Sequence, residues 1–273
     1  MEGKPEEEET KGPYPTHKNN NKKPKNPKPQ SKHPQNSTKT PNTNTSKPRK
    51  RSRNKTWIAK WLRFTNHKSL LTHTNLLPCK CPHSSKWSTA IDQTRQWTIE
   101  QLQDTCYNQF RPLKYIIDLT NTDAYYSDQD VKSDEVEHLK VRIVGQMVPD
   151  VGVVRRVVEL MERFVVVDGE VDYTVALHCT HGVSRTGFFV VLFLKKAMEL
   201  TIREAREEFE KARGYGVENE ILVPVLDYLE DIEAVETLLS FEDTCHHLEE
   251  YIRSNGQKRK IGEGATTTTT SSQ

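Results

Sequence analysis

The chain has 273 residues and a net charge of only +2, but its charges are unevenly distributed. Residues 11–55 contain fourteen Lys and Arg and no Asp or Glu, with Tyr14 as their one sizeable apolar residue. Such a composition excludes this segment from any core, because it cannot bury enough apolar surface to offset the entropy of ordering. We therefore predict a disordered basic arm over residues 1–56, attached to an acidic remainder and suited to a polyanionic partner.

The densest positive charge lies at residues 48–55, PRKRSRNK, where the arm ends. Such a run is typical of nuclear import recognition or of contact with a nucleic-acid backbone, with a solvated basic linker as the alternative. We expect a nuclear protein, with the cytoplasm as a second compartment.

Cysteine usage and hydropathy bear on the compartment. The five cysteines, at positions 79, 81, 106, 179 and 245, are odd in number and lack the spacing of a disulfide framework. The longest apolar run, Phe188–Leu194, is far shorter than the roughly 20 residues of a membrane-spanning helix. We therefore expect an intracellular protein with free thiols and no membrane contact.

Residues 79–83 and 245–247 suggest metal half-sites but lack paired zinc spacing, so neither a metal nor a cofactor is expected.

Strand and helix patterns alternate between residues 57 and 252, which predicts one α/β domain with a mostly parallel sheet flanked by helices. Capping-box spacing marks helix starts at Thr98 and Thr201, and Gly214 ends the second of these helices. Residues 253–273 are predicted to be a disordered tail. The expected strands span residues 115–120, 139–144 and 173–177, and further helices begin near residues 150, 185 and 224.

The residues that carry chemistry lie in the stretch 178–187, HCTHGVSRTG, between a predicted strand and an apolar helix. Amides of the five residues between Cys179 and Arg185 can curl around an oxyanion, and the helix N-terminus adds positive potential. A thiolate in that place has a lowered pKa and can attack phosphorus to form a phosphocysteine. The phosphate-binding loop is predicted to comprise Thr180, His181, Gly182, Val183 and Ser184 between these two residues.

Four side chains of the stretch receive individual predictions. Arg185 holds two phosphate oxygens through its planar fork. Thr186 donates its hydroxyl to the sulfur and assists its departure when water cleaves the intermediate, unless it is merely an early helix residue. His178 holds the loop through a local hydrogen bond, with an ordinary core histidine as the alternative. His181 lies at the rim, facing either solvent or substrate.

Asp150 precedes a predicted helix and has two interpretations. It could protonate a leaving group, or it could simply cap the helix, and we favour the cap. A phosphotyrosine or phosphoserine ester has a basic leaving group and benefits strongly from a general acid, whereas removal of a γ-phosphate expels a phosphate oxygen, a much better leaving group. A weak acid candidate therefore fits a polyphosphate substrate better than a phosphoprotein.

The stretch at 178–187 resembles the signature of the cysteine-dependent phosphatases. Further segments resemble the RNA 5′-phosphatase branch of that superfamily, which includes RNA triphosphatases of animal capping enzymes, of baculoviruses and of a ribonucleoprotein-interacting type. These segments are IDLTNT at 117–122, the tyrosines 125 and 126, Gly145–Gln146 and FEKARG at 209–214.

The resemblance implies a metal-independent hydrolase that removes the γ-phosphate, and also the β-phosphate, from RNA 5′ ends. It places Asp118 and Arg213 near the site as substrate-binding residues, with Arg213 holding the remaining phosphates. Ser184 departs from the branch, which has Asn there, and is typical of dual-specificity protein phosphatases, the alternative function. The chain lacks the Lys-x-Asp-Gly nucleotidyl-transfer motif of a complete capping enzyme. Expected partners are RNA 5′ ends, and ribonucleoproteins through the basic arm.

Overall fold

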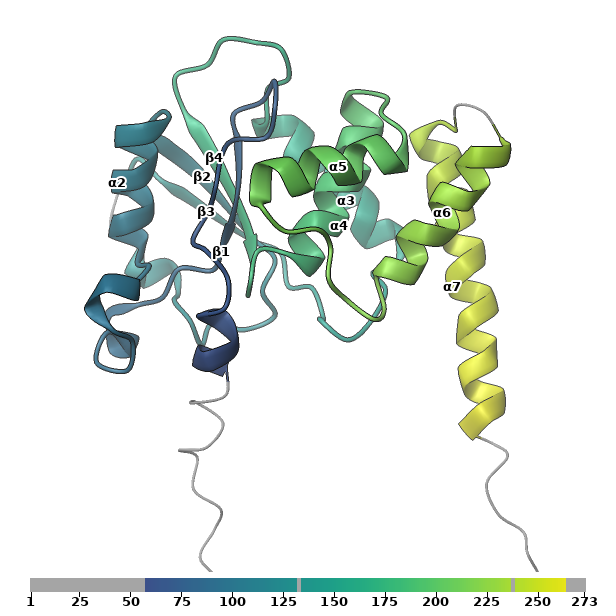
Figure 1. The fold of residues 1–273 in the computed structure, drawn as a ribbon, viewed down its shortest axis with the longest axis horizontal. Coiled ribbons are helices and arrows are strands. Elements are labelled where there is room, and N and C mark those ends of the chain that lie inside the picture. The colour runs from purple at the N-terminus through teal and green to yellow at the C-terminus, as the bar shows by residue number, and fades with distance from the viewer. Residues whose placement is uncertain (1–56, 132–133, 237–238, 264–273) are drawn as a thin grey trace, which may run out of the picture. The chain divides into compact units, whose positions relative to one another are not determined.

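The computed structural model describes residues 57–131, 134–236 and 239–263, with the side chains of the last range described to residue 255. The predicted basic arm, its nuclear-import segment and the end of the predicted tail lie outside these residues. The described part is an α/β domain with a parallel sheet between helices, as predicted (Figure 1).

Four parallel strands form the sheet in the order β1-β4-β2-β3. Every residue of β4 is buried, as expected for a strand covered on both faces. Because β4 lies between β1 and β2, its carboxyl end opens at the middle of the sheet edge, where ligands bind in open α/β folds. The strands are β1 (Leu76–Lys80), β2 (Leu113–Asp118), β3 (Glu137–Lys140) and β4 (Thr174–Cys179).

The predicted strand at 139–144 is wrong beyond Lys140, where β3 ends. The sequence alternates between apolar and polar residues here because Ile143 is buried, but the backbone at Ile143 is not part of the sheet. Its carbonyl accepts a hydrogen bond from Arg185 Nη1 at 2.7 Å instead of pairing with a strand. β4, conversely, runs two residues beyond the predicted Leu177, so that Cys179 is its last residue.

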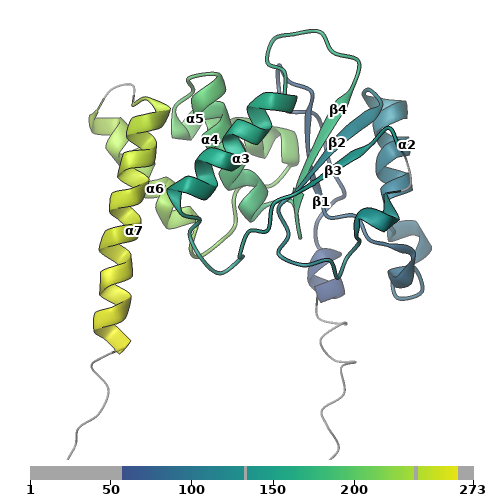
Figure 2. The ribbon, with the colours of Figure 1, turned by 180° about the vertical axis from the view of Figure 1, so that it is seen from behind.

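Helices cover both faces of the sheet. Helix α2 (Ile99–Gln109) lies on one side, and α3 (Val151–Phe164), α4 (Ser184–Ala197) and α5 (Ile202–Arg213) lie on the other (Figures 1 and 2). The predicted capping boxes at Thr98 and Thr201 are both present, and Gly214 ends α5 in the left-handed conformation. Residues 57–61 form a further short helical segment.

Two helices complete the described part, α6 (Val223–Val235) and α7 (Phe241–Glu263). Helix α7 continues past residue 252, so the predicted tail is wrong as far as Glu263. Cys245 and Leu248 bury the start of α7, and a helix that has formed extends at little cost beyond its core contacts. In the part of the chain that the structure describes, no helix is both long and apolar enough to cross a bilayer.

Two apolar cores lie on the two faces of the sheet. The larger one surrounds α4, whose residues from Thr186 to Lys195 are all buried, as predicted for a central helix. The smaller one lies under α2 and includes Trp61, Trp97 and Tyr126. Helix α4 can approach α5 closely because Gly187 has no side chain: a Cβ atom there would lie 2.5 Å from the Phe209 ring.

We predict that Gly187→Ala destabilises the domain by about 1–3 kcal/mol, because the added methyl forces α4 and α5 apart. Gly152→Ala at the start of α3 is the comparison, since its Cβ would meet only Asp150 Oδ1, at the longer distance of 3.2 Å, and alanine favours helix. Urea unfolding of the three proteins measures both effects. Equal stability of Gly187→Ala and the unsubstituted protein would contradict the close contact.

Candidate active site

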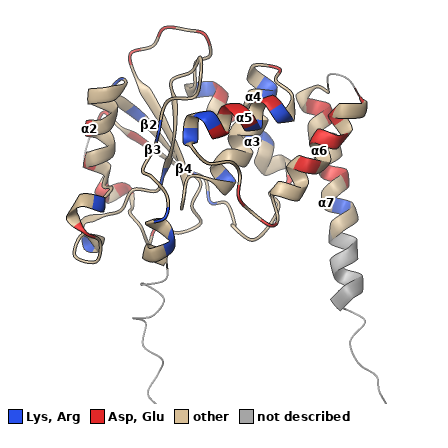
Figure 3. Ribbon diagram, in the orientation of Figure 1, with Lys and Arg blue, Asp and Glu red and all other residues tan. Residues whose placement is uncertain are grey.

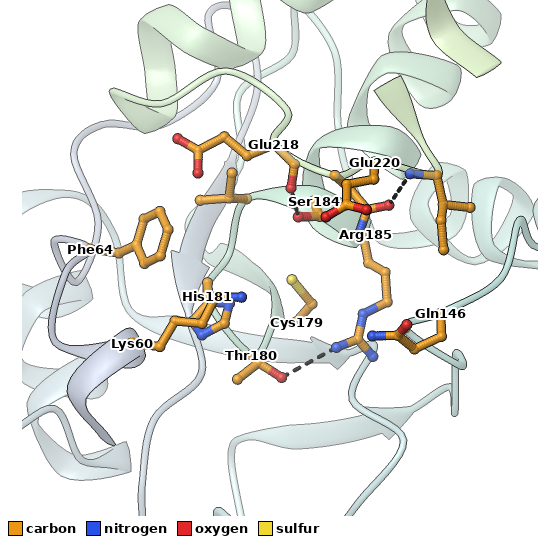
Figure 4. Close-up of a pocket in the computed structure, with 14 residues that line it drawn as sticks. Lys60, Phe64, Gln146, Cys179, Thr180, His181, Ser184, Arg185, Glu218 and Glu220 are labelled. Atoms are coloured by element: carbon orange, nitrogen blue, oxygen red, sulfur yellow. Dashed lines mark hydrogen bonds between the residues drawn. The ribbon is translucent and has the colours of Figure 1, made fainter. Parts of the chain in front are cut away.

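The loop between β4 and α4 forms the floor of a pocket of about 490 Å³. Gly182 makes the loop possible, because its φ of +68° suits glycine and a Cβ there would lie 2.0 Å from the Cys79 carbonyl oxygen. Figure 4 shows Cys179 at the centre of the pocket, with Arg185 on one side and His181 on the other. The lining residues are Lys60, Phe64, Gly145, Gln146, Cys179, Thr180, His181, Val183, Ser184, Arg185, Glu218, Asn219, Glu220 and Ile221.

Cys179 is buried beneath the loop, and burial alone would raise the pKa of its thiol. The positive charge of Arg185 and hydrogen bonds from Thr186 and from the Val183 amide outweigh burial and lower that pKa below its ordinary value. The structure thus favours a thiolate at the carboxyl end of the central strand, which is the state that a nucleophile needs.

The Arg185 guanidinium is fixed before any ligand arrives. Its Nη1 donates to the carbonyl oxygens of Leu119, at 2.9 Å, and Ile143, at 2.7 Å, and its Nη2 donates to Thr180 Oγ1 at 3.2 Å. These three bonds leave two of the five N–H donors for a ligand, the one on Nε and one on Nη2, whose nitrogens share an edge of the guanidinium. Arg185 can therefore offer two parallel donors to a phosphate, as predicted from its planar fork.

Thr186 and Ser184 differ in what their hydroxyls contact. The Thr186 hydroxyl is buried and has no oxygen or nitrogen partner within the described ranges, so it can donate to the Cys179 sulfur. The Ser184 hydroxyl donates to the backbone carbonyl of Glu218, which ties the start of α4 to the loop before α6. The side chain of Ser184 therefore has a structural partner, and its predicted phosphate contact would come from its amide.

His178 supports the loop from behind. Burial lowers the pKa of its imidazole, so it is neutral. Its Nδ1 lies 3.2 Å from the Cys179 carbonyl oxygen and its Nε2 lies 2.6 Å from the Tyr126 hydroxyl. The predicted local hydrogen bond is present, and no ring atom of His178 faces the pocket.

Asp118 lies behind the site, and its predicted contact with substrate is wrong. Its carboxylate is fully buried and binds Lys140 Nζ at 2.8 Å and the Thr120 amide at 2.7 Å. Burial alone would raise the pKa of this carboxyl, but its hydrogen bonds with His138 and Lys140 and the positive charge of Lys140 hold that pKa well below its usual range. Asp118 is therefore a charged anchor for the strand ends around Cys179.

The prediction that Arg213 holds phosphates is also wrong, because the structure shows its side chain fully buried. Its Nε donates to the Gly182 carbonyl oxygen at 3.0 Å, and its Nη2 donates to the carbonyl oxygens of His181, at 3.1 Å, and Thr65, at 2.8 Å. The guanidinium thus holds the phosphate loop by its backbone. It is a positioning residue.

Several lining residues were missed by the sequence reasoning. Lys60 and Phe64 come from the segment just after the basic arm, which has no periodicity, and Glu218 and Glu220 come from the loop before α6. Gln146 is part of the Gly145–Gln146 segment that the resemblance marked, although not as a site residue. Asp150 does not line the pocket and caps α3 by accepting from the Val153 amide at 2.9 Å, so its interpretation as a cap is confirmed.

The described residues include no group of three or more His, Cys, Asp and Glu side chains placed to hold a metal ion. Cys79, Cys81 and Cys106, like Cys179 and Cys245, are free thiols.

Comparisons with known proteins bear on the family. The chain is 27% identical over 175 residues to a tyrosine-protein phosphatase of Autographa californica nuclear polyhedrosis virus, covering 64% of this chain and 97% of the viral protein. It is 25% identical to the RNA/RNP complex-1-interacting phosphatase of Rattus norvegicus, covering 68% of this chain and 55% of that protein. The chain is thus similar, over about two thirds of its length, to proteins named as phosphatases. It is also 25% identical to the mRNA-capping enzyme of Mus musculus, over 52% of this chain and 24% of that enzyme.

Two further comparisons complete this set. No family model matches the chain. The crystal structure of Tk-PTP in the active form superposes with a TM-score of 0.43 at 20% identity, covering 61% of this chain and 97% of that one. The chain spans nearly all of the viral relative but only about half of the rat protein and a quarter of the capping enzyme.

The lowered pKa of Cys179 gives a prediction about its reactivity. Its thiolate is present above the lowered pKa, so alkylation by iodoacetamide should be lost as the pH falls through that value. Arg185→Met removes the positive charge that contributes most to lowering the pKa of Cys179. We therefore expect the midpoint of the alkylation profile to rise by about 1–3 pH units. Burial raises the pKa of Cys106 to about 12 and of Cys245 to about 11, so these thiols should react little below pH 9. A midpoint unchanged by Arg185→Met would contradict the electrostatic role of Arg185.

Proposed function

We propose that this phosphatase removes the γ-phosphate, and then the β-phosphate, from RNA 5′ ends through a phosphocysteine on Cys179. The observation that carries the proposal is the pocket itself: the Cys179 thiol, whose pKa is lowered, and the fixed Arg185 guanidinium share it with Lys60, and no aspartate is among its lining residues. In-line attack by the Cys179 sulfur on the γ-phosphorus forms a sulfur–phosphorus bond and releases the shortened RNA. Water then cleaves that bond and releases inorganic phosphate.

The nature of the leaving group favours this substrate. Expulsion of a serine or tyrosine oxygen benefits strongly from a positioned acid. Asp150 is committed to the Val153 amide as a cap, and the acidic side chains that line the pocket are Glu218 and Glu220. A β-phosphate oxygen leaves without much help from an acid, so a triphosphate suits the groups that are present.

Names of relatives support the same substrate class. One relative is described as interacting with an RNA/RNP complex and another as an mRNA-capping enzyme. The viral relative is named as a tyrosine-protein phosphatase, and this name is the observation that favours the second candidate, a dual-specificity protein phosphatase. Ser184 does not favour a protein substrate over RNA, because its hydroxyl donates to the Glu218 carbonyl oxygen.

Charge beyond the pocket agrees with an RNA partner. Acidic residues gather on α6 and on the first turns of α7 (Figure 3), so an RNA chain would avoid that face. We propose that the basic arm instead contacts the RNA or its ribonucleoprotein, and that residues 48–55 direct the protein to the nucleus.

The proposal predicts release of phosphate from triphosphorylated RNA at a higher kcat/KM than from a phosphotyrosine peptide. Thin-layer chromatography of products from RNA labelled at the β- or the γ-phosphate measures which phosphates leave. We expect Cys179→Ser to lower both releases by a factor on the order of 10³ or more while RNA binding is retained.

Two results would contradict the proposal. A higher kcat/KM for the peptide than for the RNA would make the protein phosphatase the better assignment. Unchanged phosphate release by Cys179→Ser would show that Cys179 is not the nucleophile for either substrate.

The basic arm gives a separate prediction. We expect removal of residues 1–55 to weaken RNA binding and to flatten its dependence on salt, because fewer counterions are released from the RNA. Titrations of Cys179→Ser with and without the arm, at several salt concentrations, measure both quantities. Equal slopes of log K against log[salt] would exclude the arm from the RNA contact.

A further inference from the structure

One wall of the pocket is built by the segment that follows the basic arm. Lys60 and Phe64 line the pocket together with Cys179, although more than a hundred residues of sequence separate them from it. The wall is part of the pocket because the segment is fixed in place. The Phe64 carbonyl accepts from buried Lys80 Nζ at 3.1 Å, and both the carbonyl and the hydroxyl of Thr65 accept from Arg213.

The Phe64 ring lies in an aromatic group. Its centroid is 5.1 Å from that of His181, with the planes 32° apart, and 5.2 Å from that of Tyr215, with the planes 69° apart. Burial, together with the nearby cations Lys60 and Arg185, lowers the pKa of His181 to about 4, so the imidazole is neutral at physiological pH. Phe64 and His181 therefore present two uncharged flat rings beside the thiolate, on the same side of Cys179 as Lys60 (Figure 4).

The pocket has more room and more asymmetry than a phosphate requires. Its volume of about 490 Å³ falls in the range of sites for small organic ligands. Lys60 is exposed at the wall that contains Phe64, whereas Glu218 and Glu220 line the wall that comes from the loop before α6. The positive charge of Lys60 attracts a polyanion that leaves the pocket toward the wall that contains Phe64.

We infer that Phe64, supported by His181, stacks on the base of the first nucleotide of the RNA while Lys60 contacts the phosphates between that base and Cys179. This inference rests on the proposed function and names the part of the RNA that the pocket recognises. Aromatic stacking is indifferent to base identity, because every base has a flat face. Phe64 is then a specificity-determining residue that separates an RNA end from a bare polyphosphate.

The test compares a substrate that has a base with one that has none. We expect Phe64→Ala to lower the ratio of kcat/KM for triphosphorylated RNA to kcat/KM for inorganic tripolyphosphate by about 5- to 100-fold, mainly through KM for the RNA. Phe64→Trp should keep the ratio, because indole also stacks. Tyr107→Ala is the matched control, since this aromatic residue is 74% exposed on α2. A ratio that Phe64→Ala leaves unchanged overturns the inference, including when both rates fall together.

Failure of the inference can be told apart from failure of the proposed function. Unsubstituted protein that releases phosphate from a phosphotyrosine peptide and not from RNA overturns the proposed function. A loss in Phe64→Ala that is confined to that peptide assigns the ring to a phosphotyrosyl group and overturns the inference. Unsubstituted protein that is active on RNA, combined with an unchanged ratio in Phe64→Ala, overturns the inference alone.

Discussion

The site depends on one buried cation, Arg213. Its guanidinium has no carboxylate within ion-pair distance in the described ranges, and its hydrogen bonds go to backbone carbonyls of the phosphate loop and to Thr65. Burial of a charge without an opposite charge is costly unless its donors are satisfied. Four of its five N–H donors are engaged here, and the positive charge under the loop favours an anion above it. The end of α5, the loop and the segment before β1 are thereby joined into one unit.

A second set of buried polar groups holds the loop from the opposite side. His178, Tyr126 and His138 form a chain of hydrogen bonds that ends at the carboxylates of Asp118 and Asp128. Burial would lower the pKa of His138, but these two carboxylates raise it, so the chain pairs a cationic imidazole with two anions. Such a network is rigid when every member is satisfied. The loop is therefore held on both sides before any ligand binds.

The sequence predicted the site where its signals were local. Cys179 and Arg185 were found because a strand, a turn and a helix follow one another in a single stretch, and the caps at Thr98, Asp150 and Thr201 were found for the same reason. Arg213 was misassigned because its partners include Thr65, which is distant in sequence, and because a basic residue near a phosphate site suggests a direct contact. Phe64 was missed because its segment follows no periodic pattern and is placed by Lys80 and Arg213, which no local rule identifies.

The position of Lys60 has a consequence for how the arm can act. The arm ends at residue 56, four residues before a side chain that lines the pocket. If the arm binds RNA as proposed, that RNA is tethered to the chain a few residues before Lys60, and the length of the arm sets the local concentration of the RNA 5′ end. On the same proposal, RNA that has lost its γ-phosphate remains tethered while its β-phosphate enters, so that even a weak, sequence-independent arm makes the pocket processive.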